Sequence, residues 1–395
     1  MIPNVLVDGF VLEQRFRNGG SYVYANNVIG SLLRLDDSLR PKIRIARVPD
    51  SSSNASQVYI TEKADVIQVP QLRDITRWRL GMGGAAMRKL GGDVVYCPAP
   101  INCTFLKSPA VVTIHDASIV KSPSQTWLRN SVERAIIWSA VRSATRIITD
   151  SENSRRDLME VYGIPSSKIS VIYLGYDRSV FSANTAGSAR GNPIRQRLGI
   201  KRPYLLHHGI VQPRKNLQRL IMAFDLLLKR CPDLDLDLVL AGPIGWRSEK
   251  IVAAATQLQG RVILTGPVTQ EDLVALIRYA VLCVIPSLYE GFCLPLLECM
   301  GCGVPTIAAR SSCLPEISGE ILRYFDPLSI EDMAAAIHAG ICDDELRRDL
   351  AAKGLRRAQQ FSWTRCAQET LDVLAEVAGF SNSDRNTTRV ESLVV

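Results

Sequence analysis

The sequence predicts an α/β protein with two domains, each built around a parallel sheet. Short apolar segments alternate with helix-like segments from residue 4 to residue 377, and this alternation is typical of doubly wound sheets. Small and polar residues at 182–188 interrupt the series and indicate a linker. A chain of 395 residues is long enough for two separate cores.

In the first half, apolar segments predict a series of strands. Val28, Leu32 and Leu35 recur at helical spacing and predict an amphipathic helix over 22–35. The expected strands are 4–8, 43–48, 58–60, 94–97, 110–114, 146–149 and 169–172.

The second half repeats the pattern from residue 204 onward. Its expected strands are 204–206, 236–240, 262–264, 282–285 and 306–308, and its expected helices are 217–228, 271–280, 330–339, 345–360 and 363–377. Ligands of such sheets bind beyond the carboxyl ends of the strands, so the motifs that follow strands are the first candidates for a site.

Charge is distributed unevenly along the chain. Residues 1–180 hold 23 Lys and Arg against 16 Asp and Glu, a net +7, whereas residues 181–395 hold 24 against 23, a net +1. The excess favours an anionic membrane surface or a phosphorylated acceptor as partner of the first half, although a solvated basic surface would look the same. Nucleic acid is less favoured, because no basic cluster is interleaved with aromatic residues.

Composition also bears on the compartment. No apolar run approaches the ~18 residues needed to span a bilayer, and the first residues lack the basic region and cleavage site of a signal peptide. Cys299 and Cys302 form a CxxC, but no second CxxC or His pair completes a zinc site, and we interpret both as small apolar fillers. We expect a cytoplasmic protein and leave peripheral contact with the inner membrane face open.

The most informative motif places two carboxylates, Glu290 and Glu298, eight residues apart after an expected strand. Gly291 lets the backbone turn, and the segment 294–298 predicts the start of a helix. The N–H groups and the dipole of a helix N-terminus attract an anion such as a diphosphate. An ordinary strand–turn–helix unit with two surface glutamates would show the same spacing, so spacing alone leaves both interpretations open.

Two adjacent cations, Arg214 and Lys215, follow the first expected strand of the second half. A departing diphosphate gains charge as the bond to its sugar breaks, and neighbouring cations stabilise that transition state. Arg offers a bidentate fork and Lys a compact charge. A solvated pair at a helix start is the alternative, although cations there oppose the helix dipole.

These segments resemble motifs of the retaining, nucleotide-sugar-dependent glycosyltransferases of family 4, also called group 1. Residues 209–216 resemble the G-x-x-x-P-R-K-N block, and residues 290–298 resemble the E-x7-E motif. Other blocks follow in the same order, so the resemblance covers nearly the whole chain. It implies the GT-B fold, with two Rossmann-like domains facing across a cleft. The expected parts are an acceptor domain over 1–185, a donor domain over 200–362, a helix that packs back on the first domain over 363–379, and a flexible tail over 380–395.

The resemblance also implies residue roles in the second half. Lys215 and Arg214 would clamp the diphosphate, Glu290 would contact the donor sugar, and Glu298 would accept hydrogen bonds from the ribose. Some relatives carry an additional Arg where this chain has Ile210, which leaves open whether Arg214 supplies the second charge. The other implied donor-binding residues are Gly20, Gly209, Gly266, Val268, Gly291, Phe292, Cys293 and Leu294.

In the first half, the expected strand 110–114 ends in His115-Asp116. A single His is more often structural than functional, but the family carries a His-Asp here, and the resemblance implies that His115 lies near the donor sugar. Gly20 belongs to a segment that resembles the family's Gly-rich loop. Residues 151–154 resemble its S-E-x-S turn, where we expect Ser151 to cap a helix.

No cofactor and no metal ion are expected. The D-x-D spacing of Asp233, Asp235 and Asp237 falls before and at the start of the expected strand 236–240 rather than after a strand end, so we expect no acidic pair to hold a divalent cation on a diphosphate. His207 and His208 would point to opposite faces of a strand. Arg214 and Lys215 would take the place of a metal. Since no carboxylate pair is suitably placed for double displacement, we expect a front-face mechanism with retention.

The preferred function is transfer of mannose from GDP-mannose to a saccharide or lipid-linked saccharide in bacterial surface-polysaccharide synthesis, because the motifs resemble those of such mannosyltransferases. Three alternatives stay open. They are a UDP-glucose-type hexosyltransferase, a nucleotide-sugar epimerase of the same fold, which would turn over without an acceptor, and a non-catalytic nucleotide-sugar-binding subunit. The intact Glu290, Glu298 and Lys215 argue against the last.

Overall fold

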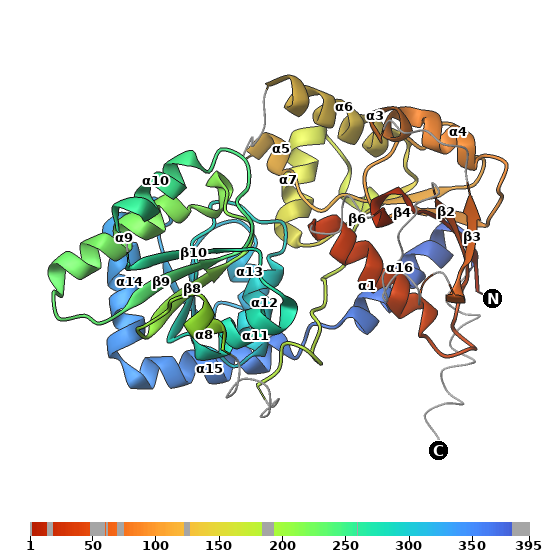
Figure 1. Cartoon of the computed structure of the whole chain (residues 1–395). Coiled ribbons are helices and arrows are strands. Elements are labelled where there is room, and N and C mark those ends of the chain that lie inside the picture. The colour runs from red at the N-terminus through yellow and green to blue at the C-terminus, as the bar shows by residue number, and fades with distance from the viewer. Residues whose placement is uncertain are drawn as a thin grey trace, which may run out of the picture. The chain divides into compact units, whose positions relative to one another are not determined.

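The computed structural model describes residues 2–13, 19–47, 60, 62–68, 75–121, 127–183, 193–258 and 260–380. The chain separates into two compact units (Figure 1). The first is drawn from Met1–Val120, Thr126–Gly175 and Trp363–Val395, and the second from Lys121–Gln125 and Tyr176–Ser362. Within the described residues, no helix combines the length and the apolar character that crossing a membrane requires.

A seven-stranded parallel sheet forms the centre of the first unit. Its order is β3-β2-β1-β4-β5-β6-β7, so the winding direction reverses between β1 and β4. The strands are β1 (Asn4–Asp8), β2 (Lys42–Arg47), β3 (Asp65–Gln68), β4 (Val94–Cys97), β5 (Ala110–Thr113), β6 (Arg146–Thr149) and β7 (Ile169–Val171).

Helices surround this sheet, and the last of them comes from the end of the described chain. α16 packs against α1 and against β4, β5 and β6, and Arg146 of β6 forms an ion pair with Glu376 of α16. The helices are η1 (Phe10–Leu12), α1 (Gly20–Leu33), α3 (Ile75–Arg77), the π-helical η3 (Trp78–Met82), α4 (Gly83–Met87), α5 (Ser118–Lys121), α6 (Trp127–Ser143), α7 (Glu152–Tyr162), η4 (Ser166–Lys168) and α16 (Trp363–Val377).

The second unit has a six-stranded parallel sheet in the order β10-β9-β8-β11-β12-β13, which reverses between β8 and β11. Its strands are β8 (Tyr204–His208), β9 (Asp237–Ala241), β10 (Val262–Gly266), β11 (Leu282–Ile285), β12 (Thr306–Ala309) and β13 (Arg323–Phe325). All residues of β8, β9, β11 and β12 are buried, as expected for a sheet covered on both faces.

Two groups of helices cover this second sheet. α9 packs against α10 and α14, whereas α12 packs against α15 (Figure 1). The helices are α8 (Ile194–Arg197), the 3₁₀-helix η5 (Pro213–Lys215), α9 (Leu217–Arg230), α10 (Glu249–Gln257), α11 (Gln270–Tyr279), α12 (Leu294–Gly301), α13 (Leu314–Ser318), α14 (Ile330–Cys342) and α15 (Asp344–Ala358).

The structure differs from the sequence-based expectations in a few places. The expected strand 58–60 lies, apart from the helical Ile60, outside the described residues, and the strand beside β2 is β3. The second unit begins at Tyr176, whose ring lies against Gly301 of α12 together with the backbone carbonyl of Phe181. The expected tail lies outside the described residues beyond residue 380.

Two glycines allow the ends of β8 and β9 to approach closely. Gly209 and Gly242 follow these strands with φ angles of +131° and +141°. A Cβ atom on Gly242 would lie 2.1 Å from the carbonyl oxygen of Gly209, which is far inside van der Waals contact. Gly242 also donates a hydrogen bond to the Gly266 carbonyl, 3.1 Å away. The close approach of the β8 and β9 ends therefore depends on the absence of a side chain at Gly242.

Substitution of Gly242 by alanine tests this packing. Gly242→Ala combines an unfavourable backbone conformation with a backbone clash, so we expect it to lower the free energy of unfolding by roughly 1–3 kcal/mol more than a matched control. The control is Gly199→Ala, where φ is +67° and nothing would lie within 4 Å of the new Cβ. Urea denaturation followed by circular dichroism provides the measurement, and equal losses would contradict the predicted clash.

Candidate active site

The candidate site of the second unit lies where the winding of the sheet reverses. β8 and β11 are neighbours with parallel pairing, and η5 follows β8 while the segment 286–293 follows β11. The Leu288 N–H donates to the Arg214 carbonyl over 2.9 Å and joins the two segments. The carboxyl ends of strands at such a reversal are the usual position for a ligand.

A three-residue ion cluster forms the centre of this site. Lys215 Nζ lies 2.6 Å from Glu290 Oε1, and Arg214 Nη1 lies 2.7 Å from Glu290 Oε2. Arg214 Nη1 also donates to the Tyr289 carbonyl at 2.6 Å. Each carboxylate oxygen therefore accepts from a different cation. We call Arg214, Lys215 and Glu290 the clamp cluster.

Burial makes the charges of the clamp cluster strong. Lys215 is 7% exposed and Glu290 is 4% exposed, so water screens them little. Burial alone would raise the pKa of Glu290, but the charges of Arg214 and Lys215 outweigh it and lower that pKa to about 2. Glu290 is therefore ionised throughout the physiological range.

The start of α12 lies directly after Glu290. Cys293, the N-cap residue, has a φ of +77°, no side chain caps the first turn, and Pro295 occupies that turn. The buried Phe292 stacks edge-to-face on Phe361, with the ring centroids 5.8 Å apart, and the Glu290 N–H donates to Ser312 Oγ over 2.9 Å. These contacts hold the helix N-terminus at the end of β11, where its N–H groups and dipole favour an anion.

Glu298 lies further along α12 and has a different electrostatic environment. Its pKa is raised to about 7, because burial outweighs the opposing charge of Lys215. His208 Nε2, at the end of β8, lies 3.6 Å from Glu298 Oε2. Burial, with His207 and Lys215, lowers the pKa of His208 to about 3, so its imidazole is neutral at pH 7.

Other expected donor-binding residues surround the clamp cluster. A Cβ atom on Gly209 would lie 3.8 Å from Lys215 Cε. Gly242 lies against Gly209 and donates a backbone hydrogen bond to the Gly266 carbonyl, which connects Gly266 to the same strand ends. Val268 lies in the loop between β10 and α11. The second unit thus brings Gly209 and Gly266 into one group of strand ends beside Lys215, and Val268 follows Gly266 by two residues in the sequence.

The remaining expected residues belong to the first unit. His115 follows β5, and its Nδ1 lies 2.8 Å from Asp150 Oδ2 after β6. Gly20 is the first residue of α1, which also carries Tyr24, and the Tyr24 ring packs edge-on against His115 with the centroids 4.8 Å apart. Ser151 caps α7 by accepting from the Ser154 N–H at 3.1 Å, which confirms the expected cap.

Sequence reasoning missed three partners of the expected residues. It did not identify Asp150 as the partner of His115, Ser312 as the acceptor for the Glu290 N–H, or His208 as the neighbour of Glu298. It also did not anticipate that Glu290 pairs with both clamp cations. The pairs Asp150–His115 and Ser312–Glu290 are each more than twenty residues apart in sequence, so only the order of the strands could have indicated them.

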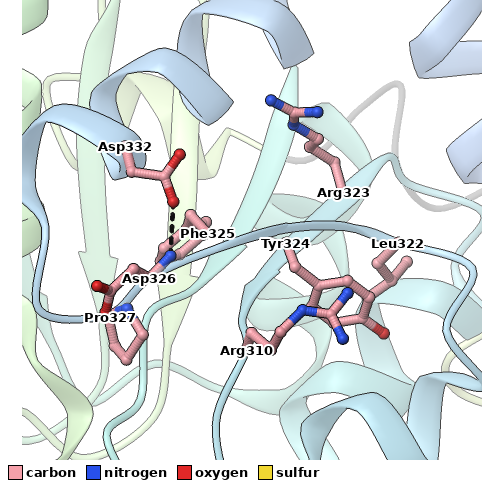
Figure 2. Close-up of a pocket in the computed structure, with 8 residues that line it drawn as sticks. All are labelled: Arg310, Leu322, Arg323, Tyr324, Phe325, Asp326, Pro327 and Asp332. Carbon is pink, nitrogen blue, oxygen red and sulfur yellow. Dashed lines mark hydrogen bonds between the residues drawn. The ribbon is translucent and has the colours of Figure 1, made fainter.

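A separate hollow of about 510 Å³ lies over the edge strand β13 (Figure 2). Arg310 lies over the Tyr324 ring, 4.5 Å from its centroid, and pairs with Glu320 at 3.0 Å. Asp332 accepts from the Asp326 N–H at 2.7 Å. None of the expected site residues lines this hollow, and we do not assign it to the candidate site.

The double charge on Glu290 predicts an asymmetry between two substitutions. Glu290→Gln leaves the buried Lys215 and the partly buried Arg214 without a counter-charge and should cost roughly 3–5 kcal/mol of stability. Lys215→Met should cost less, because Arg214 still pairs with the carboxylate. Since the pKa of Glu290 is about 2 rather than 4.5, the cluster stabilises the fold above about pH 4.5 and loses this contribution as pH falls toward 2.

Urea denaturation of both variants and of the double variant at pH 7 measures this asymmetry. The double variant should be more stable than Glu290→Gln alone, because it removes one unpaired cation. Strictly additive losses would show that the three groups do not interact.

Comparison with known proteins places the chain in a family. The family model for glycosyl transferases group 1 matches residues 192–357, which contain the clamp cluster and Glu298. The model for glycosyltransferase family 4 matches residues 45–180, which contain His115. The two models together cover most of both units.

Curated relatives agree with this assignment. The O-antigen chain mannosyltransferase B of Escherichia coli is 31% identical over 273 residues, which cover 67% of this chain and 69% of the relative. The serotype-specific mannosyltransferase WbdA of Escherichia coli is 28% identical over 58% of this chain, and the match covers only 28% of that longer protein.

Similarity of the fold extends across the chain. Sucrose-phosphate synthase from Thermosynechococcus elongatus superposes with a TM-score of 0.73 at 18% identity, covering 95% of this chain and 99% of that one. Its fold agrees with two parallel-sheet units of the GT-B type. The chain therefore belongs to the group 1 glycosyltransferases and has the GT-B fold.

Proposed function

We propose that this glycosyltransferase moves a hexose from a nucleoside diphosphate sugar to a hydroxyl of a saccharide or lipid-linked saccharide, and that it does so with retention and without a metal ion. The clamp cluster carries this proposal. It places two cations beside a helix N-terminus at the carboxyl ends of β8 and β11. This combination suits a diphosphate whose negative charge increases during the reaction.

Donor binding would redistribute the hydrogen bonds of the cluster. Glu290 now neutralises part of the charge of Arg214 and Lys215. A diphosphate would take the two cations as its own partners and release the Glu290 carboxylate to accept from a hydroxyl of the donor sugar. The exchange would avoid leaving either buried cation unpaired. Glu298, whose pKa is near 7, would accept from the ribose hydroxyls.

All bonds broken and formed in the transfer step, and the proton that moves, belong to the two substrates. The bond between the anomeric carbon and the diphosphate oxygen breaks, and the acceptor oxygen forms a bond to the same face of that carbon. The departing diphosphate receives the proton of the acceptor hydroxyl. Lys215 and Arg214 would stabilise the charge on the leaving group in place of a divalent cation.

The relatives, rather than the geometry, support the choice of a donor. Two mannosyltransferases of Escherichia coli are among the similar proteins, which favours mannose, and we take GDP-mannose as the first donor to test. Uridine diphosphate glucose is the alternative. Base contacts made through the backbone at Gly266 and Val268 would not by themselves separate the two bases.

A thermal-shift panel tests the donor class. GDP, UDP, ADP and their common sugar conjugates are added with EDTA to wild type, Lys215→Ala and a control, Lys229→Ala, whose side chain on α9 is 71% exposed. One nucleotide should stabilise wild type and the control, and Lys215→Ala should lose that shift. In transfer assays, Lys215→Ala should lower kcat by roughly 10²–10³-fold.

Several outcomes of this panel and of the transfer assays would contradict the proposal. A shift that appears only with added Mg²⁺ would contradict metal independence, and the absence of any shift would remove the nucleotide-sugar donor. Conversion of the donor without an acceptor to an epimeric sugar nucleotide would favour the epimerase alternative. Binding without transfer to any acceptor would favour a non-catalytic subunit.

A lipid-linked acceptor is supported by an exposed apolar patch on the first unit. Leu80, Met82, Phe105 and Trp138 are 45%, 43%, 51% and 52% exposed, and we call these four residues the apolar patch. They lie on η3, on the loop after β4 and on α6. The Asn102 N–H donates to the Arg79 carbonyl at 2.8 Å, and the Cys103 N–H to Ser143 Oγ at 2.8 Å, so these three segments adjoin one another.

Cations predominate around the apolar patch. Residues 75–107 and 129–143 contain eight Lys and Arg but only two acidic residues, Asp93 and Glu133, and Glu133 pairs with Arg79 at 2.8 Å. Arg142 lies over the Trp138 ring, 4.8 Å from its centroid. Apolar side chains within a cationic surface suit the interface of an anionic bilayer, and we propose peripheral contact with such a membrane through this patch.

Vesicle co-sedimentation tests the membrane contact. Wild type should bind vesicles of phosphatidylglycerol and phosphatidylcholine but not of phosphatidylcholine alone, and binding should weaken with salt. The double variant Phe105→Ser, Trp138→Ser should bind several-fold less, whereas Met222→Ser, Leu328→Ser, which changes exposed residues of the second unit, should bind as wild type. Binding that does not depend on anionic lipid, or on the patch, would contradict the proposal.

A further inference from the structure

The loop after β9 continues the pairing of β8 with β9 beyond the ends of both strands. The Val211 N–H donates to the Pro243 carbonyl at 2.9 Å, and the Gly245 N–H donates to the Val211 carbonyl at 2.8 Å. Val211 is 1% exposed and forms an isolated parallel bridge with Ile244. The segment that leads from β8 into η5 is therefore fixed along one side by residues 243–245.

Gly245 lets these two segments approach closely. A Cβ atom on Gly245 would lie 2.7 Å from Ile210 Cγ2, 2.9 Å from the Val211 carbonyl oxygen and 3.4 Å from Gln212 Cβ. The first two distances are shorter than real Cβ atoms show. The buried Ser248, just before α10, donates its hydroxyl hydrogen to the Gly245 carbonyl at 2.8 Å. The loop is thus packed directly on residues 210–212 and held from its other end.

A side-chain hydrogen bond completes this packing. Trp246 Nε1 donates to Gln212 Oε1 at 3.0 Å. An indole N–H can only donate, so this contact also fixes which end of the Gln212 amide faces the ring. Arg247 lies over the Trp246 ring, 5.8 Å from its centroid. We call the hydrogen bond between Trp246 and Gln212 the indole brace.

Gln212 is the residue through which the indole brace reaches the clamp cluster. It is the N-cap residue of η5, and its carbonyl accepts from the Lys215 N–H at 3.0 Å. A lysine carries its ammonium on a flexible four-carbon stem, so the reach of that group depends on where the backbone places the stem. A shift of Gln212 would therefore displace Lys215, and Arg214 with it.

The indole brace supports η5 without the help of Glu290. Glu290 pairs with both clamp cations, but the proposed exchange with a diphosphate would release this carboxylate. Two other contacts hold η5. They are the bond from the Leu288 N–H to the Arg214 carbonyl at 2.9 Å, on the side of β11, and the indole brace on the side of β9. The cations would keep their positions while their partner changes.

We propose that Trp246 is a positioning residue of the diphosphate site: through Gln212 it holds η5 so that Arg214 and Lys215 face the diphosphate of the donor. The inference rests on the proposed function for its ligand. It goes further by assigning to Trp246 and Gln212 a share of the preference for a diphosphate over a monophosphate. Supporting hydrogen bonds of this kind fix the residues that touch a ligand, and a misplacement of about 1 Å can cost roughly 10²-fold in rate.

Titration calorimetry with GDP and GMP tests the inference, or with the diphosphate and monophosphate of the base that the donor panel selects. The ratio of the two Kd values measures what the second phosphate contributes. Trp246→Phe keeps an aromatic ring without the N–H, and Gln212→Met keeps the length without the acceptor. Each should reduce the ratio roughly 3–10-fold, with GMP affinity within about twofold of wild type. The double variant should lose no more than either single variant.

Thr256→Val is the matched control. The exposed Thr256 hydroxyl on α10 donates to the Val252 carbonyl at 2.9 Å, so this variant also loses one side-chain hydrogen bond, but away from Gln212. It should keep the wild-type ratio. In transfer assays, Trp246→Phe should lower kcat more than it raises KM for the donor, because the charge on the leaving group is greatest in the transition state. A merely structural role of Trp246 would lower the melting temperature and leave the ratio unchanged.

The outcomes distinguish this inference from the proposed function. If wild type binds neither nucleotide, the proposed function fails and the inference fails with it. If wild type prefers GDP and Lys215→Ala loses that preference, but Trp246→Phe and Gln212→Met keep it, the inference alone is overturned. Additive losses in the double variant would show that the two side chains act separately and would overturn it as well. Should Trp246→Phe not fold, Gln212→Met carries the same comparison.

Discussion

The organisation of the second unit depends on one buried carboxylate held between two cations. Glu290 accepts from Lys215 at 2.6 Å and from Arg214 at 2.7 Å, and this pairing is what permits two cations at the end of buried strands. Burial is the main cause that keeps His207 and His208 neutral and raises the pKa of Glu298, and the charge of Lys215 adds to the first effect and opposes the second. Burial and this set of ion pairs together determine the protonation of the neighbouring titratable groups.

The same arrangement explains why the site prefers an exchangeable anion. Without Glu290, the two cations would be unpaired charges at the ends of buried strands. If each cation had its own carboxylate, no positive charge would be left to bind a ligand. A single carboxylate shared by two cations satisfies both in the unliganded chain. It also leaves the cluster with a net positive charge, beside a helix N-terminus, for a diphosphate. The Gly209–Gly242 contact keeps side chains away from these strand ends.

Sequence reasoning could predict the features that depend on residues close together in the chain. Continuous apolar runs predicted the buried strands, and the glutamate spacing and the Arg214-Lys215 pair predicted the residues at the ends of β8 and β11. The pairing of Asp150 with His115 could not be predicted, because it depends on β5 and β6 being neighbours.

The carboxylates of Glu290 and Asp150 differ in the partners that hold them. Glu290 has two cationic partners and a pKa near 2, so its carboxylate stays ionised at physiological pH. Asp150 has only His115, and the pKa of that imidazole is raised from a value that already lies near neutrality. If activity depends on pH near neutrality, the group that titrates must therefore lie outside the clamp cluster. Glu298, beside His208 in the second unit, is such a group, because burial raises its pKa to about 7.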